Sequence, residues 1–216
     1  VSDTAFVVID AAPVLTLDPD TDVCANNPVL SLNTTVANAG GIRWTNFTGT
    51  ALDSDTDTSL IYTLSPAEIF TDKQVVFIVL SRQNGLCNAV SDSLTVIVTD
   101  APTVDAGPDQ IVCEDVANLN LVGFTTVAGG GNWTTPDGSG GFSAIDVANS
   151  LSTYTPVAAD ITADTIELVL TTTGSGKCLE VNDSRLVIFD PLATLNAGAA
   201  QTVCTNNYPV QLNAVG

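Results

Sequence analysis

The sequence repeats itself with a period of about 90 residues, and this repeat limits what the chain can fold into. Cysteines recur at Cys24, Cys113 and Cys204, which are 89 and 91 residues apart. Trp44 and Trp133 are also 89 residues apart. Solenoid units are shorter, at roughly 20–50 residues, whereas a complete all-β domain of the sandwich type has about 100. We therefore expect small complete domains in tandem.

The register of the repeat sets the expected domain limits. Val1, Val90 and Val181 each precede a cysteine by 23 residues, and each introduces an apolar segment of the same frame. The expected limits are 1–10 for the last strand of a preceding repeat, 11–99 and 100–190 for two full repeats, and 191–216 for the start of a further, truncated repeat. The chain is thus expected to be part of a longer polypeptide.

Short apolar runs between clusters of Gly, Pro, Asn and Asp predict the fold class. We expect an all-β chain of tandem immunoglobulin-like antiparallel β-sandwiches, each pinned by one intradomain disulfide. Runs without alternation, at 75–80 and 166–171, are typical of strands that are covered on both faces or lie centrally in a sheet. The triple glycine at 129–131 predicts a turn.

Two further local patterns predict structure within each repeat. Ser65-Pro66-Ala67-Glu68 has the capping-box spacing with proline at the first helical position, which predicts a helical turn. Residues 156–160 occupy the matching place in the second repeat. Trp44 and Trp133 are expected in the cores, with sugar stacking on exposed rings as the alternative.

Charge excludes several classes of partner. The net charge is −19, from 24 acidic and 5 basic residues. Such a chain repels the phosphates of nucleic acids and the surface of an anionic membrane. We expect no nucleic-acid binding and no direct membrane insertion, since no apolar stretch approaches the roughly 18 residues of a membrane span. The acidity is expected to keep a long array soluble.

The cysteines favour an oxidising compartment. We expect the pairs Cys24–Cys87 and Cys113–Cys178, which close loops of comparable length within one repeat each. Cys204 would then pair beyond the chain. The alternative is a set of buried free thiols, and a metal site is disfavoured because the chain has no histidine and no C-x-x-C motif.

Two acidic clusters are candidate calcium ligands. Carboxylates at alternate positions converge on Ca²⁺ where a loop curls around the ion. The candidates are Asp18, Asp20 and Asp22 near the start of the first full repeat, and Asp53, Asp55 and Asp57 in a loop. The alternative is a solvated acidic turn, so a structural Ca²⁺ is the one cofactor that the sequence suggests.

No enzyme is expected, and no catalytic residue is assigned. The absence of histidine removes the usual Ser-His-Asp and Cys-His sites. The acidic residues are mostly aspartates in turn motifs, where they commonly bond their own backbone.

Several strings carry a resemblance to a known family. They are residues 105–113 (DAGPDQIVC), 129–134 (GGGNWT), 154–156 (YTP) and 168–174 (LVLTTTG) followed by Cys178. Together they resemble the tandem immunoglobulin- and PKD-like repeats of giant surface adhesins of the Bacteroidota, the SprB type of gliding-motility adhesin. The first full repeat departs from this pattern at 17–20 and 42–43.

The resemblance implies a function and a location. It implies export by the type IX secretion system and display at the cell surface as a filament. It also implies O-glycosylation in Asp-Ser/Thr-apolar motifs, for which Thr4, Ser93 and Thr165 are candidates, with unmodified hydroxyls as the alternative.

We therefore expect a structural stalk segment of a cell-surface adhesin in gliding motility. Its partners would be neighbouring repeats of the same chain, with extracellular surfaces or polysaccharides bound by regions outside this sequence. The alternatives are a static matrix or sheath fibre and a polysaccharide-binding module.

Overall fold

Four nine-residue strands carry the cores, because every second side chain in them is buried. They are β6 (Gln74–Arg82), β7 (Ser91–Thr99), β16 (Thr165–Thr173) and β17 (Asn182–Asp190). Period-two burial is what a sheet with one face on a core produces. These strands lie centrally in their sheets, as predicted, but they are not covered on both faces: Ile97 and Leu186 are exposed on the outer side.

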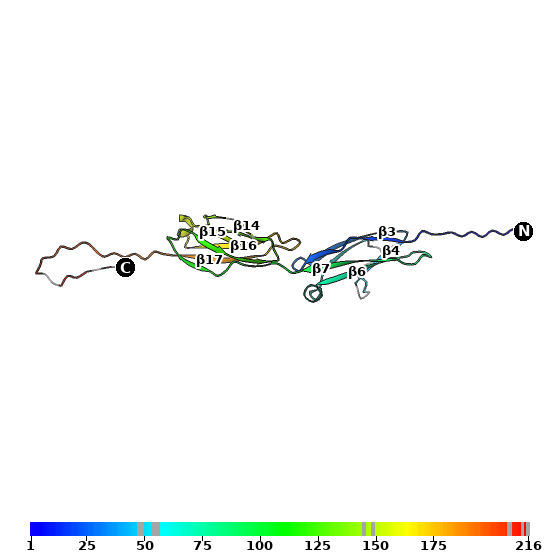
Figure 1. Ribbon diagram of the computed structural model, residues 1–216, viewed down its shortest axis with the longest axis horizontal. Coiled ribbons are helices and arrows are strands. Elements are labelled where there is room, and N and C mark those ends of the chain that lie inside the picture. Colours follow the sequence, from blue (N-terminus) through cyan, green and yellow to red (C-terminus); the bar gives the residue numbers. More distant parts are fainter. Residues whose placement is uncertain are drawn as a thin grey trace. The chain divides into compact units, whose positions relative to one another are not determined.

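The computed structural model describes residues 1–46, 50–52, 57–143, 146–147, 150–206, 209–212 and 214. The chain divides into two compact units (Figure 1). Unit 1 comprises Val1–Thr103 together with Ser175–Glu180, and unit 2 comprises Val104–Gly174 together with Val181–Gly216. The predicted repeat limits follow the sequence period and stay predictions.

Unit 1 has two sheets, in which all neighbouring strands but one pair are antiparallel. One sheet has the order β1-β3-β5, and the other has the order β2-β7-β6-β4. The remaining bounds are β1 (Val14–Leu17), β2 (Thr21–Cys24), β3 (Val29–Ala37), β4 (Gly41–Asn46) and β5 (Ser59–Thr63). The edge strand β2 runs parallel to β7, with Cys24 opposite Thr99.

Unit 2 has the same plan with more, shorter strands. Its large sheet has the order β14-β12-β16-β17-β9, and it is accompanied by β10-β15-β13 and the pair β11-β8. The bounds are β8 (Thr103–Asp105), β9 (Gln110–Cys113), β10 (Leu119–Val122), β11 (Phe124–Thr126), β12 (Gly130–Thr134), β13 (Gly141–Phe142), β14 (Asp146–Val147) and β15 (Leu151–Thr155). Again the edge strand β9 runs parallel to the last long strand, with Cys113 opposite Asp190. The predicted all-β class of tandem immunoglobulin-like sandwiches is confirmed.

Both tryptophans are core residues, as predicted. Trp44 and Trp133 are fully buried, which rules out the alternative of exposed sugar-stacking rings. The indole N–H of Trp44 donates to the backbone oxygen of Asp57 at 3.2 Å, and that of Trp133 donates to Ser150 at 3.0 Å. A buried indole needs such a partner, and both units supply it in the same way.

The two predicted helical turns are present. In unit 1 the backbone N–H of Ser65 donates to the Glu68 carboxylate at 2.7 Å, and the Glu68 N–H lies 3.4 Å from the Ser65 hydroxyl, which is the predicted capping box. It opens η1, a π-helical turn (Glu68–Asp72). In unit 2 the matching turn is α1 (Ala158–Thr162).

The triple glycine is only partly a turn. Gly130 and Gly131 lie within β12, so the prediction of a turn over 129–131 is wrong for these two residues. A Cβ at Gly131 would come within 2.7 Å of a Leu170 methyl and 2.8 Å of the Ser150 hydroxyl oxygen. Glycine is present there because the Leu170 side chain of the neighbouring strand β16 and the Ser150 hydroxyl leave no room for a Cβ.

The terminal segments contribute no long strand. Residues 1–13 and the described residues after Asp190 belong to none of the named strands. Phe6, Val7, Val8 and Ile9 are largely exposed there. Their assignment to flanking repeats stays a prediction. Among the described residues, no helix is long and apolar enough to cross a membrane.

Candidate functional site: a disulfide-clamped loop

The structure contains a disulfide that joins the two sequence repeats. Cys24, the last residue of β2, is bonded to Cys178, with 4.9 Å between the Cα atoms and a sequence separation of 154 residues. Cys87, Cys113 and Cys204 are free thiols in this chain. The predicted pairs Cys24–Cys87 and Cys113–Cys178, one intradomain disulfide to each repeat, are therefore wrong.

Strand geometry explains why the predicted pairs do not form. Cys24 lies beside Thr99, at the end of β7, whereas Cys87 lies in the loop before β7 begins at Ser91. A nine-residue strand spans roughly 27 Å, and a disulfide requires Cα atoms less than about 7 Å apart. The same argument separates Cys113, opposite Asp190, from a cysteine that precedes β17.

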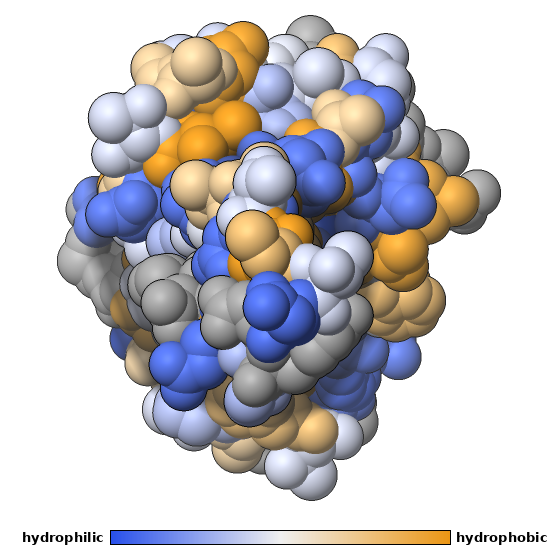
Figure 2. All heavy atoms as spheres, turned by 90° about the vertical axis from the view of Figure 1, so that its left-hand side faces the viewer, coloured by the Kyte–Doolittle hydropathy of each residue, from blue (hydrophilic) through white to orange (hydrophobic). Residues whose placement is uncertain are grey.

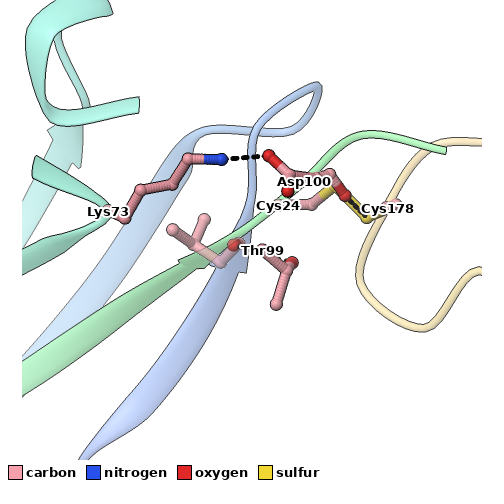
Figure 3. A network of polar contacts seen from close by, with 6 residues as sticks. Cys24, Lys73, Thr99, Asp100 and Cys178 are labelled. Carbon is pink, nitrogen blue, oxygen red and sulfur yellow. Dashed lines mark hydrogen bonds and ion pairs between the residues drawn. A yellow bond between two sulfur atoms is a disulfide. The ribbon is translucent and has the colours of Figure 1, made fainter. Parts of the chain in front are cut away.

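The partner of Cys24 is supplied by a loop that we call the clamp loop, Ser175–Glu180. It connects β16 to β17 in the second sequence repeat, yet it belongs to unit 1. Figure 3 shows the yellow bond between Cys24, at the end of its strand, and Cys178 on this loop. The carbonyl oxygen of Asp100 lies 3.7 Å from the sulfur of Cys24 and 3.6 Å from that of Cys178.

Two asparagines fix the backbone of the clamp loop next to the disulfide. The Asn26 amide donates to the Leu179 carbonyl at 3.0 Å and accepts from the Leu179 N–H at 3.0 Å. The Asn27 amide donates to the Lys177 carbonyl at 3.1 Å. A side chain that both donates to and accepts from one backbone residue imitates a strand partner, so the loop is held by directional bonds as well as by sulfur.

Lys177 adds a charged contact at the same place. Its ammonium donates to the Asp22 carboxylate at 2.7 Å, to the Asp22 carbonyl at 2.9 Å and to the Thr21 hydroxyl at 2.8 Å. The hydrogen bond from Lys177 holds the pKa of Asp22 below its usual range. Both side chains are about half exposed, so this pair adds orientation more than stability.

A second ion pair holds the side chain of Asp100, the residue whose carbonyl contacts the disulfide. Lys73 is the residue that follows η1, and its ammonium binds the Asp100 carboxylate (Figure 3). Lys73 has a left-handed backbone, with φ of 55°, because it ends the π-helical turn. The residue whose carbonyl contacts both sulfurs is thus itself held by its side chain.

The acidic candidates for calcium do not converge in the part of the chain that is described. Asp18 accepts from the Asn33 N–H at 2.8 Å, Asp20 accepts from the Thr95 N–H at 2.8 Å, and Asp22 binds Lys177. Asp53 and Asp55 lie outside the described residues, and the Asp57 carbonyl accepts from Trp44. No group of three metal-binding side chains occurs among the described residues, and calcium binding stays a prediction.

The candidate glycosylation sites are accessible. Thr4, Ser93 and Thr165 are all exposed, and Ser93 and Thr165 lie on β7 and β16. The modification itself stays a prediction.

On the face that Figure 2 shows, hydrophobic and hydrophilic residues are interspersed in small patches.

Comparisons with known proteins define no family. No known protein family and no curated protein matches the chain. Among solved structures, immunoglobulin domains 1–5 of Sidekick-1 match at 11% identity over 83% of this chain, with a TM-score of 0.43; the chain spans 39% of that structure. Fibronectin(III)-like modules of Clostridium thermocellum CbhA match at 14% identity over 82% of this chain and 95% of theirs, with a TM-score of 0.41. Mouse cadherin-23 EC22–24 matches at 17% identity over 85% of this chain and 67% of its own, with a TM-score of 0.42. At these TM-scores the likenesses add nothing to the fold that the strands define.

Cysteine position, charge and repeat frame were all visible in the sequence, but the pairing was not. The asparagines at 26 and 27 and the clamp loop were missed. One signal was available: in each repeat a nine-residue strand, β7 or β17, lies between the second cysteine and the residue opposite the first cysteine.

Proposed function

We propose that this chain is a load-bearing stalk segment of a secreted cell-surface adhesin, displayed as a filament and used in gliding motility. The observation that carries the proposal is the Cys24–Cys178 bond, which connects one repeat covalently to the next. A chain that only presented separate binding modules would have no use for such a connection. The net charge of −19 supports display as a soluble array.

The disulfide changes the path that a pulling force takes. Tension applied at the two ends would pass through the sulfur atoms and leave β3 to β16 unloaded, because these strands lie between Cys24 and Cys178. The 154-residue separation then withholds roughly 500 Å of extended chain, at about 3.4 Å for each residue. Resistance to lengthening is the property that a stalk needs.

Single-molecule stretching tests this mechanical role. We expect a contour-length gain of roughly 500 Å when the chain is pulled in the presence of a reductant, compared with the oxidised chain. Cys113→Ser is the matched control, since Cys113 is exposed and free, and it should behave as the parent chain. Equal extension with and without reductant would contradict the role in bearing load.

The motility assignment needs a cellular test. An antibody to this repeat region would be applied to living source cells, and the fluorescence would be tracked. Label that travels along the surface supports a gliding adhesin. Label that stays fixed supports a static adhesin or sheath fibre, and label that sheds into the medium supports a matrix protein; either would overturn the motility assignment.

A further inference from the structure

Cys87 occupies the same surroundings as the disulfide-bonded Cys178. Asp100 and Ala11 are counterparts in the repeat, 89 residues apart like Val90 and Val1. The sulfur of Cys178 lies 3.6 Å from the carbonyl oxygen of Asp100, and the sulfur of Cys87 lies 3.7 Å from that of Ala11. Cys178 is thus held against the segment that follows β7, and Cys87 is held against the equivalent segment one repeat earlier in the sequence.

Cys113 has the backbone setting of Cys24. Each is the last residue of an edge strand that pairs in parallel with the final long strand of its repeat. Each carbonyl then accepts a hydrogen bond from the residue three positions on, Asn27 at 3.0 Å and Val116 at 3.1 Å. The Cys113 thiol is exposed, so a partner can reach it.

We propose that the Cys24–Cys178 bond is one rung of a continuous disulfide ladder. In this ladder Cys113 pairs with the second cysteine of the following repeat, about 154 residues downstream, and Cys87 pairs with the first cysteine of the preceding repeat. Cys204 takes the role of Cys24 once more. The inference rests on the tandem-array part of the proposed function and is independent of gliding.

Each rung forms by thiol–disulfide exchange with a disulfide-donating oxidoreductase. One thiolate attacks the donor disulfide and forms a mixed disulfide, and the second thiolate displaces the donor sulfur. Two thiols of the array become one disulfide, and their two electrons and two protons convert the donor disulfide into two thiols.

The rungs overlap, and the overlap has a consequence for the array. Cys178 and Cys204 are 26 residues apart, and so are Cys87 and Cys113. Two covalent paths run along the array, and each alternates between a disulfide and a 26-residue segment such as 178–204. Under tension, only these 26-residue segments of each path carry the load. Every peptide bond inside the array is spanned by at least one disulfide, so a single proteolytic cut leaves the array connected.

The sequence also predicts which rungs have the asparagine clamp. Asn26 both donates to and accepts from Leu179, and its counterpart after Cys204 is Asn206. The counterpart after Cys113 is Asp115, whose carboxylate accepts but cannot donate. The Cys113 rung therefore lacks one of the two backbone bonds and should be reduced faster than the Cys24 rung.

Peptide mapping of the full-length protein tests the ladder. The protein would be alkylated without reduction, digested, and its disulfide-linked peptides identified by mass spectrometry. We expect the Cys113 peptide to be joined to the peptide that carries the second cysteine of the following repeat. An alkylated Cys113, or a Cys113–Cys178 link, would overturn the proposal.

Nicking gives a second readout. After limited proteolysis, the full-length protein should keep its mass on a non-reducing gel and separate into fragments when it is reduced. Fragments that separate without reductant would contradict the ladder. Neither readout depends on surface display or movement, so a static label on cells would overturn the motility assignment and leave this inference standing.

Discussion

The two units have separate cores, and they bury different side chains at one equivalent position. Unit 1 buries Leu94, and unit 2 buries Arg185, its counterpart 91 residues later. The Arg185 guanidinium lies over the Trp133 ring, 5.2 Å from its centroid, and donates to the Asn120 carbonyl at 3.3 Å. Its Nε has no hydrogen-bond partner, and burial lowers the pKa of Arg185.

The units also anchor their helical turns differently. In unit 2 the Tyr154 hydroxyl donates to the buried Asp160 carboxylate at 2.8 Å, which also accepts from the N–H groups of Ser139 and Val157 at 2.5 and 2.9 Å. In unit 1 Tyr62 donates to a half-buried Glu68 at 3.0 Å. Unit 2 therefore buries two charged side chains, Arg185 and Asp160, where unit 1 has buried Leu94 and a half-buried Glu68.

Exchanging the residue types at this equivalent core position should have the largest effect on stability. Leu94→Arg puts an unpaired charge into the core of unit 1 and should cost about 4 kcal/mol or more in its free energy of unfolding. Arg185→Leu should instead stabilise unit 2 by about 1 kcal/mol, since it removes a poorly paired charge at the expense of a cation–π contact. Denaturant unfolding measures both, and a destabilised Arg185→Leu would show that the guanidinium is required.

Removing the disulfide should come next. In the chain-entropy model a 154-residue loop contributes about 5 kcal/mol, and measured disulfides typically give 2–4. Cys24→Ser with Cys178→Ser should lower the unfolding free energy by a comparable amount, measured in urea. The control Cys113→Ser should leave the stability unchanged because that thiol is exposed. Equal loss in both variants would refute a special role for Cys24.

The buried aspartate should make unit 2 the more acid-sensitive unit. Burial raises the pKa of Asp160, but hydrogen bonds from Ser139, Val157 and Tyr154 outweigh it and hold the pKa below its usual value. The stabilisation is therefore complete above the unfolded pKa near 3.9 and is lost as pH falls through the lower folded value. Asp160→Asn should cost about 2 kcal/mol at pH 7.

Melting curves between pH 2 and 6 distinguish this origin from general acid unfolding. The Asp160→Asn variant should have a flatter pH dependence than the parent, and an unchanged pH dependence in this variant would contradict the assignment to Asp160. At the alkaline end, burial and then Asp160 raise the pKa of Tyr154 to about 12, which absorbance titration at 295 nm can follow. A Tyr154 that ionises at its usual pH would contradict the buried pair.

The smallest effect is expected at the surface ion pair. Lys177→Gln should cost less than about 1 kcal/mol, because both partners are about half exposed, and the difference should shrink in high salt. A double-mutant cycle with Asp22→Asn measures the coupling. A coupling energy well above about 1 kcal/mol would contradict the view that this ion pair adds orientation more than stability.

The features that the sequence predicted correctly are local ones. The capping box at Ser65, the two core tryptophans and the central long strands follow from spacing within a few residues. The arginine at 185 was also visible, at a position where the other repeats have Ala5 and Leu94. A local pattern does not show whether such a residue points into the core, and Arg185 does.

The disulfide was missed because it depends on pairing between distant segments. Its partner is decided by the parallel contact between β2 and β7, which places Cys24 at the far end of β7 from Cys87. Loop length alone favoured Cys24–Cys87 and Cys113–Cys178, since these two pairs close loops of similar length, one in each repeat. Gly131 was missed for a related reason, since its close neighbours Leu170 and Ser150 are distant in sequence.

A thiol count on the oxidised, denatured 216-residue chain tests the central claim most directly. The chain would be labelled with a maleimide before any reduction, and its intact mass would be measured. The structure predicts three labels, on Cys87, Cys113 and Cys204, and a Cys24–Cys178 peptide in the digest. A single label, on Cys204, would mean that each repeat closes its own disulfide and would contradict the covalent connection between repeats.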